Sequence, residues 1–151
     1  MVKDILIHPN KILRTESAIV EDFSNPKLSQ LIKDLKSTLK VTSNGLGLAA
    51  PQIGVNMRVF AIKNEDRSIK IFINPRFSNF FKKAKKEKMI EGCLSIPGVS
   101  VSIFRVKKVL MKYTNENGEK LSMRAKGVLA QAFQHEIDHL DGVLCIDRVR
   151  K

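Results

Sequence analysis

The chain has 151 residues, of which 43% are hydrophobic and 28% charged, and this composition is typical of a globular domain with a buried core. No apolar run approaches the roughly 20 residues that a membrane-spanning helix requires, and the opening residues, MVKDILIHPN, lack the long apolar core of a secretory signal. The sequence contains no internal repeat and no low-complexity linker. We therefore expect residues 1–151 to form a single domain that is cytoplasmic, or lies inside an organelle if a targeting segment was removed.

The net charge indicates which partners to expect, and the number of cysteines indicates whether disulfides are expected. The formal net charge is +12 and the densest basic run is KKAKKEK at residues 82–88, which predicts attraction to polyanions. Apart from Phe80 and Phe81 no aromatic residue accompanies this run, and no nucleic-acid-binding signature is present. We expect weak affinity for ribosomes or RNA and no sequence-specific recognition of nucleic acid. The two cysteines, Cys93 and Cys145, are too few for a disulfide framework, and we expect both to be free.

The first regular element is predicted at residues 25–40, NPKLSQLIKDLKSTLK. Pro26 suits a first helical turn, and apolar residues follow at helical spacing: Leu28, Leu31, Ile32, Leu35 and Leu39. We expect an amphipathic helix whose apolar face belongs to the core. The next segments, MRVFAIK at residues 57–63 and IKIFINP at residues 69–75, have strand-like composition and are separated by the polar turn NEDRS. They predict an antiparallel hairpin.

The second half of the chain changes from strand to helix. Residues 99–114, VSVSIFRVKKVLMKYT, alternate enough to be interpreted as a strand, and the turn NENG leads into KLSMRAKG at residues 120–127 as its partner. Apolar residues then follow helical spacing, and Gly142 stands where a helix would stop, which predicts a helix from Val128 to Asp141. The predicted fold class is α+β, with strands around one important helix.

That helix carries the segment FQHEIDHLDG at residues 133–142. Residues four apart lie on the same side of a helix, about 6 Å from each other, so His135 and His139 can point at one ion with Glu136 beside them. The alternative is that these three side chains line a solvated helix face, because the motif is short and chance matches occur. A third ligand would favour the metal site.

A hydrolytic metal centre usually holds its ion with three protein groups and leaves one position for water. His8 precedes Pro9 and is expected to be a surface or packing residue. Cys145 lies in the apolar, strand-like stretch GVLCID and is expected to be a buried small hydrophobe. Cys93 lies in EGCLS, ahead of Pro97, where a thiolate can approach a helix. We favour Cys93 as the third ligand.

A third stretch, GLGLAAPQ at residues 45–52, combines glycines, small residues and one side-chain amide. It lacks the third glycine of a dinucleotide-binding loop and the lysine of a phosphate-binding loop. Taken alone, it predicts a tight buried bend.

The motifs GLGLAAPQ, EGCLS and QHEIDH, in this order and at these separations, resemble the signature motifs of the peptide deformylase family. The likeness extends through HPNKILR near the start, INP at residues 73–75 and HLDGVLCIDR near the end, so it covers nearly the whole chain. It implies a small α+β domain in which antiparallel sheets surround the motif-bearing helix. It also implies a hydrolase that removes the formyl group from the N-terminal formylmethionine of nascent polypeptides, releasing formate.

The same resemblance implies roles for individual residues. One divalent ion would be bound by three side chains: Cys93, His135 and His139. The ion would lower the pKa of bound water to about 7, and Glu136 would be the general base for its attack on the formyl carbon. The Gln52 amide and the backbone N–H of Leu94 would stabilise the oxygen on which charge develops. In the family the physiological ion is Fe²⁺, with Zn²⁺, Ni²⁺ or Co²⁺ able to replace it, and one thiolate with two imidazoles suits all four.

The resemblance, together with helical spacing one turn before His135, also places four residues near an apolar pocket for the methionine side chain: Leu46, Gly47, Gln131 and Ala132. An extended peptide is expected to pair with the backbone of Gly47. Gln131 departs from the family, in which an apolar or arginine side chain often stands at this position. Its effect on specificity is open.

Three charged residues have two interpretations each. Glu91 and Arg105 are expected either to pair near the mouth of this pocket, as in the family, or to be surface charges. Asp138 is expected either to orient a metal ligand or to face solvent. Many family members also continue with a basic helix that helps them dock on the ribosome, whereas this sequence ends at IDRVRK. Docking would then depend on other basic patches, such as residues 82–88, or be absent.

Two other functions compete with this interpretation. A metalloprotease or aminopeptidase could use the same helix motif, but these enzymes generally have histidine or glutamate as the third ligand. A basic binding protein could keep the fold without activity, but none of the expected catalytic positions is replaced.

Overall fold

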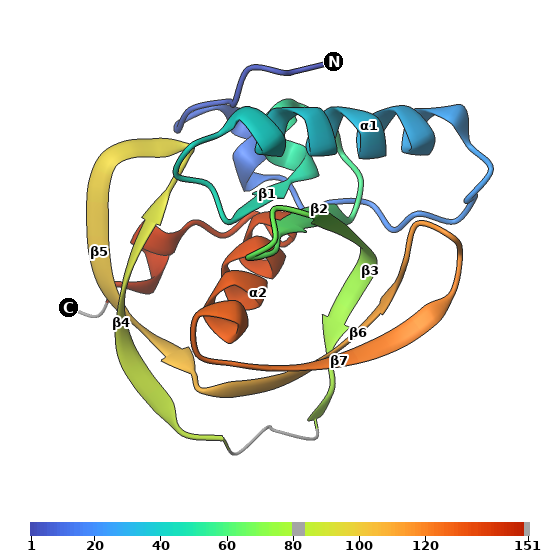
Figure 1. The fold of residues 1–151 in the computed structure, drawn as a ribbon. Helices are drawn as coiled ribbons and strands as arrows, with labels where there is room; N and C mark the ends of the chain where they lie inside the picture. Colours follow the sequence, from blue (N-terminus) through green and yellow to red (C-terminus); the bar gives the residue numbers. More distant parts are fainter. Residues whose placement is uncertain (80–83, 150–151) are drawn as a thin grey trace.

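The computed structural model describes residues 1–79 and 84–149, in which two antiparallel sheets surround a central helix, α2 (Gly127–Leu140) (Figure 1). The larger sheet has the strand order β1-β2-β3-β6-β7, with the bounds Gly47–Ala49, Val59–Lys63, Ile69–Phe77, Lys108–Thr114 and Lys120–Lys126. The smaller sheet pairs β4 (Lys86–Cys93) with β5 (Ile96–Val106). This arrangement confirms the α+β fold expected for the chain, with the HEIDH segment on the central helix.

The first helix, α1 (Pro26–Val41), forms where apolar periodicity predicted it. The Asn25 side chain accepts a hydrogen bond from the N–H of Lys27 at 2.9 Å, and Pro26 occupies the first turn, so this end of the helix is capped. Its buried leucines pack against β1, β2 and β3, in a cluster that includes Ile71 and Ile73. α1 therefore covers one side of the larger sheet.

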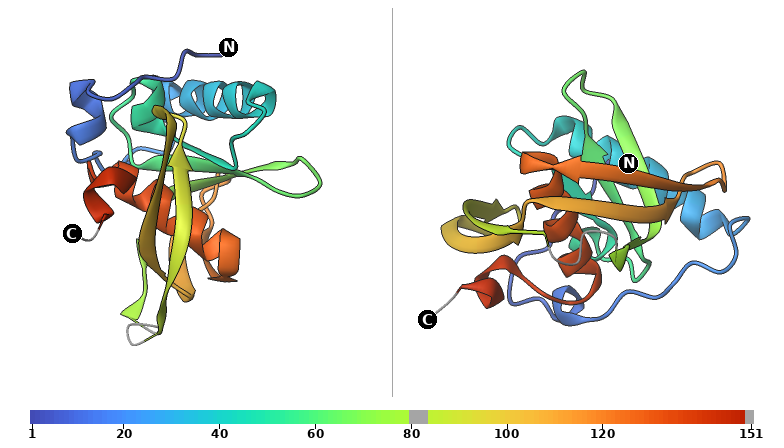
Figure 2. Two further views of the ribbon diagram at one scale, coloured as in Figure 1. Left: turned by 90° about the vertical axis from the view of Figure 1, so that its left-hand side faces the viewer. Right: turned by 90° about the horizontal axis from the view of Figure 1, so that it is seen from below.

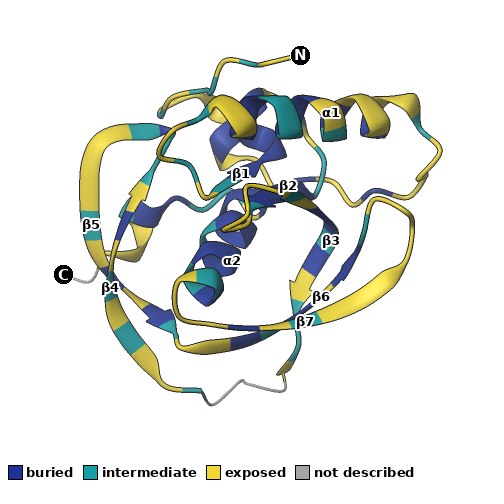
Figure 3. Ribbon diagram, viewed as in Figure 1, coloured by how far each residue is buried: buried dark blue, intermediate teal, exposed yellow. Residues whose placement is uncertain are grey.

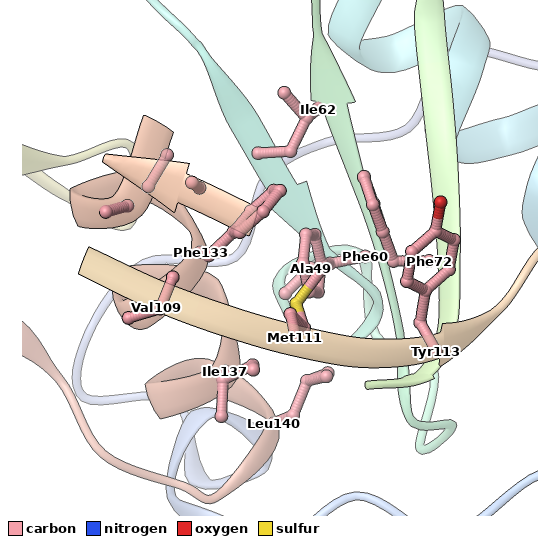
Figure 4. Packing of buried hydrophobic residues seen from close by; sticks show 13 residues of the cluster. Ala49, Phe60, Ile62, Phe72, Val109, Met111, Tyr113, Phe133, Ile137 and Leu140 are labelled. Carbon is pink, nitrogen blue, oxygen red and sulfur yellow. The ribbon is translucent and has the colours of Figure 1, made fainter. Parts of the chain in front are cut away.

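The other side of the same sheet packs on α2, which begins and ends one residue before the predicted bounds. Phe133 of α2 contacts two rings from the sheet: its centroid is 5.2 Å from that of Phe72 and 6.1 Å from that of Phe60. These rings, with Met111 and Tyr113 of β6, form a core cluster from which water is excluded (Figure 4). Burial of this kind contributes about 1.5–3 kcal/mol for each large side chain, and it holds α2 rigidly inside the curve of the sheet.

The predicted strand at residues 99–114 is wrong in one respect, because the structure divides it between the two sheets. β5 ends at Val106 and β6 begins at Lys108, while the N–H of Lys107 donates to the carbonyl of Lys85 at 2.8 Å. The two halves of the run therefore pair with different partners. β4, which the sequence did not predict, pairs with β5 and forms a ribbon that runs across α2 (Figure 2, left).

The remaining elements are short. The β2–β3 hairpin and the β6–β7 pair form as predicted. The described residues also form the 3-10 helices η1 (Lys11–Arg14), η2 (Ala50–Ile53) and η4 (Cys145–Arg148). The last of these replaces the strand-like conformation expected for GVLCID. In the described part of the chain, no helix is both long and apolar enough to cross a membrane.

Burial follows from this arrangement. α2 is largely buried, whereas the outer sides of β5 and β7 are exposed (Figure 3). Of the basic run at residues 82–88, the first two lysines lie outside the described residues and the remainder leads into β4. The centre of the molecule is thus a helix enclosed by sheets, with charged side chains outside.

Candidate metal centre

Two elements bring the candidate ligands together. α2 presents His135 and His139 one turn apart, and Cys93 is the last residue of β4. Their ligand atoms all lie within 4.8 Å of one another. The Sγ atom of Cys93 is 3.3 Å from Nε2 of His139, and this Nε2 is 3.2 Å from Nε2 of His135. The three side chains therefore surround one point.

These separations suit one tetrahedral ion. Two nitrogen ligands, each about 2.0–2.1 Å from such an ion, lie about 3.3 Å apart, close to the 3.2 Å between the imidazoles. Without an ion, two ring nitrogens that face each other need a proton between them, so a cation stabilises this arrangement. One thiolate and two imidazoles bind Fe²⁺, Zn²⁺, Co²⁺ or Ni²⁺. The donor set fits the metal-dependent chemistry of the resemblance and does not choose among these ions.

The other ligand candidates lie elsewhere in the described part of the chain. Cys145 is free and buried, and burial raises the pKa of its thiol. His8 is half-buried, and its backbone N–H donates to the carbonyl of Ser95. Cys93 is free as well, so the expected absence of a disulfide is confirmed.

A buried carboxylate orients the first histidine ligand. Nδ1–H of His135 donates to Glu91 Oε2 at 2.7 Å, which leaves Nε2 of the ring for a metal. Arg105 holds Glu91 in place with two hydrogen bonds of 3.0 and 2.6 Å. Glu91 and Arg105 are 6% and 4% exposed, so they pair inside the protein and are not surface charges.

Asp138 was expected to orient a metal ligand directly, or to face solvent, but it is buried and its carboxylate contacts two arginines. It accepts hydrogen bonds from Arg105 at 2.8 Å and from Arg148 at 2.8 and 3.1 Å. Its carboxylate therefore positions Arg105, which in turn positions Glu91. The sequence did contain a signal for the direct partner of His135, because Glu91 and Cys93 are two residues apart on a strand and so point to the same side.

Burial and charge set the protonation of these groups. Burial would raise the pKa of Glu91, but hydrogen bonds from His135 and Arg105 outweigh it and lower that pKa to about 2. Burial likewise opposes charge on His135, yet its contacts with Cys93 and Glu91 hold the pKa of His135 well above its usual value. Burial and the charge of His135 keep the pKa of His139 well below its usual value. The metal-free pair therefore holds its proton mainly on His135, and a cation held by the two rings would take the place of that proton.

Glu136 lies beside the ligands and is 3% exposed. Burial raises the pKa of its carboxyl to about 7, against the opposing charge of His135. Among the described residues its Oε2 atom has no hydrogen-bond partner, so this oxygen can accept a proton from a water or a substrate. A glycine is required nearby, because a Cβ atom on Gly47 would lie 2.6 Å from Glu136 Oε1.

The amide of Gln52 has a fixed direction. Its Oε1 accepts from the N–H of Ala49 at 2.9 Å, while its Nε2 donates to Oγ of Ser95 at 3.1 Å and lies 3.9 Å from Sγ of Cys93. The donor end therefore faces the metal centre. Leu94 directly follows Cys93 and lines the same cleft.

An open cleft of about 630 Å³ leads to the centre. Every residue expected to act as a metal ligand, general base, oxyanion donor or pocket residue lines it except His139, which is 1% exposed. Gln131 lies at the rim and donates to the carbonyl of Ile90 at 3.0 Å and to Glu91 at 3.3 Å, so it ties α2 to β4. Sequence reasoning missed Val128, which is 64% exposed and also lines the cleft. Its place four residues before Ala132 was the available signal.

Comparison with known proteins agrees with this geometry. The family model for polypeptide deformylase matches residues 2–151. Peptide deformylase 2 of Clostridium acetobutylicum is 40% identical over 148 residues, which are 98% of this chain and 95% of that protein. The peptide deformylase of Pseudothermotoga lettingae is 43% identical over 149 residues, covering 99% of this chain and 84% of that one.

Solved structures give the same result. The peptide deformylase of Thermotoga maritima has a TM-score of 0.89 and 34% identity, covering 100% of this chain and 99% of that one. The Synechococcus elongatus peptide deformylase, solved with actinonin, has a TM-score of 0.89 and 36% identity, covering 99% of this chain and 79% of that one. The chain belongs to the peptide deformylase family.

Proposed function

We propose that the protein removes the formyl group from the N-terminal formylmethionine of nascent polypeptides and releases formate. The observation that carries this proposal is the meeting of Cys93, His135 and His139 around one point, with the unpartnered Oε2 of Glu136 beside them at the base of an open cleft. Family membership supports the same reaction. We also propose that residues 1–151 form one catalytic domain.

In this proposal the chain holds one divalent ion through Cys93, His135 and His139. A bound ion of this kind supplies a nucleophilic water at neutral pH and polarises a carbonyl. The donor set suits several metals, and we propose Fe²⁺ as the ion in the cell because the protein belongs to a family in which that ion is physiological.

The other roles in the reaction belong to side chains and one backbone N–H of the protein. Glu136, with a pKa of about 7, accepts a proton near neutral pH and can later return it to the leaving amine. The amide Nε2 of Gln52 and the N–H of Leu94 donate to the formyl oxygen as negative charge develops there. Glu91 keeps the His135 ring in the orientation that a ligand needs.

Substrate binding is proposed for the outer part of the cleft. Leu46, Gly47, Gln131 and Ala132 surround the methionine side chain, and an extended peptide pairs with the backbone at Gly47. We propose that the protein acts in the cytoplasm, where nascent formylated chains occur, with a weak affinity for ribosomes through its basic surface.

The test is formate release from formyl-Met-Ala-Ser by protein prepared without oxygen, with bound metal quantified and Glu136→Gln as the matched variant. We expect turnover in the wild type and its loss in the variant at unchanged metal content. Fully metallated wild type that releases no formate would contradict the proposal. Unblocked peptides, assayed in parallel, distinguish a deformylase from an aminopeptidase.

A further inference from the structure

The outer side of β6 and β7 carries a dense group of basic side chains. Residues directly opposite each other in an antiparallel pair point to the same side of a sheet, and the register places Lys108 opposite Lys126. In the same way Arg76 of β3 lies opposite Lys112. We call this surface the basic sheet face and define it by six exposed residues: Arg76, Lys108, Lys112, Lys120, Arg124 and Lys126.

The basic sheet face is open because of the way the larger sheet curves. Val109, Met111 and Tyr113 point inward to the core around α2, so the residues between them point outward. α1 packs on β1, β2 and β3, whereas β6 and β7 lie on the far side of α2 from it (Figures 1 and 2). No residue of the basic sheet face lines the cleft. A partner on this face would leave the metal centre accessible.

Five of the six residues of this face carry positive charges that no ion pair balances within the described part of the protein. In the described part of the chain, no carboxylate forms an ion pair with the five residues Arg76, Lys108, Lys112, Lys120 and Lys126. Elsewhere surface lysines do find partners, as in the pairs Lys36–Glu116 and Lys107–Glu87. Like charges directly opposite each other, as at Lys108 and Lys126, destabilise a sheet. A polyanion would relieve this repulsion.

The chemistry of the face selects one kind of polyanion. Insertion into a membrane interface uses apolar and aromatic side chains, and the outward positions between the basic residues offer a half-buried Leu110 and a polar Ser122. The face also has no aromatic ring on which bases could stack. The lysine, arginine and serine side chains of this face are among those that contact phosphate oxygens in nucleic-acid complexes. The face thus suits a phosphate backbone.

We propose that the basic sheet face binds the phosphate backbone of structured RNA without base specificity. Alternate residues along a strand are about 7 Å apart and the hairpin is roughly 20 Å long, so several phosphates can be contacted together. The choice of RNA over other polyanions rests on the proposed function, because a nascent chain is held by the ribosome, whose surface is largely RNA.

The test is a titration of a fluorescently labelled RNA hairpin with metal-loaded protein, followed by anisotropy between about 50 and 200 mM salt. The first variant replaces Lys108, Lys112 and Lys126 with glutamine. The matched control replaces three exposed lysines of α1 with glutamine: Lys27, Lys33 and Lys40. Both variants lose three charges from the net +12. Far-UV circular dichroism and the melting temperature serve as the measure of folding, and formate release from formyl-Met-Ala-Ser is recorded separately.

We expect the sheet variant to bind RNA at least about tenfold more weakly, with the slope of log affinity against log salt reduced by about 2. The α1 variant should lose much less of its affinity for RNA. Both variants should release formate at the wild-type rate. Equal losses in the two variants would overturn the proposal, because net charge alone would explain them. A third variant replaces Lys85, Lys86 and Lys88 with glutamine. If it loses more RNA affinity than the sheet variant does, the proposal is overturned, because the RNA-binding surface would then lie at β4.

Binding of the wild type and the sheet variant to vesicles that contain an anionic lipid is measured as well. Binding to vesicles that is tighter than to RNA and sensitive to the sheet variant would overturn the choice of RNA. The titration needs no catalytic activity. A protein that releases no formate therefore refutes the proposed function and still tests the basic sheet face.

Discussion

The amide of Gln52 is held between Ala49 and Ser95, with its donor end toward Cys93. Removal of one donor to a developing oxyanion typically costs about 3 kcal/mol. We therefore expect Gln52→Leu to lower turnover by roughly 100-fold or more while metal content stays unchanged. Steady-state formate release and metal analysis measure both quantities.

The control for this prediction is Ser95→Ala, which removes one contact that orients the amide but keeps the amide itself. It should lower turnover by less than Gln52→Leu does. Loss of the ion from the Gln52 variant would show that the residue supports the metal, and the oxyanion role would be wrong.

Gly47 sets the distance between β1 and the carboxylate of Glu136. A Cβ atom there would meet Oε1 of Glu136 at 2.6 Å and Cδ1 of Ile62 at 2.9 Å. We expect Gly47→Ala to displace Glu136 and to reduce kcat strongly, with the ligand residues untouched. The comparison is Gly92→Ala, where the added Cβ meets nothing closer than 3.7 Å. Equal kcat values in the two variants would refute a close approach between Gly47 and the carboxylate of Glu136.

At the scale of elements, the end of α2 depends on Gly142, two residues after Leu140. Gly142 has φ +75°, and a Cβ atom on it would lie 2.7 Å from the carbonyl oxygen of Arg14. Gly118 has a similar φ of +83° but open space around it. Left-handed backbone costs roughly 1–2 kcal/mol for a residue with a Cβ, so Gly118→Ala should lose about that much stability.

Gly142→Ala should lose more than Gly118→Ala, because the contact with Arg14 adds to the same backbone cost. The free energy of unfolding, measured with urea for both variants, isolates the contact as the difference between them. No difference would mean that the chain near Arg14 moves aside freely.

The helices and hairpins were predictable because their signals are local. α1 and α2 follow apolar periodicity with a proline or a glycine at one end, and the β2–β3 turn is polar and short. The division at Lys107 was not predictable, because the pattern of β5 continues into β6 and only pairing with Lys85 separates them. β4 was missed because its less exposed side includes Glu87 and Glu91 while Ile90 lies on its exposed side, so polar and apolar residues do not alternate in the sequence.

The site shows the same contrast between local and distant information. The ligand pair His135 and His139 follows from helical spacing alone, whereas its meeting with Cys93 depends on how β4 crosses α2. The link from Arg148 through Asp138 and Arg105 to Glu91 joins four elements, η4, α2, β5 and β4. Residues 42 or more positions apart cannot be matched by periodicity in a single sequence, and the three motifs of the family supplied that information instead.

For the whole molecule, the pairing of Glu91 predicts a dependence of stability on pH. Its folded pKa of about 2 lies below the ordinary 4.5, so its contribution is complete above pH 4.5 and is lost as the pH falls toward 2. The shift corresponds to stability on the order of 3 kcal/mol. In metal-free protein, the difference in unfolding free energy between wild type and Glu91→Gln should shrink over this range. A difference that stays constant would contradict the assignment.

The position of Cys93 on one sheet and of the histidines on the central helix would make an ion bound by all three a cross-link between the two elements. Coordination joins Cys93 to His135, 42 positions later in the chain, and a covalent link over a loop of this length would remove about 4 kcal/mol of conformational entropy from the unfolded chain. Chelation should therefore lower the melting temperature. It should also speed amide hydrogen exchange in β4 and β5 more than in β2 and β3, because the β4–β5 ribbon would lose its tether to α2.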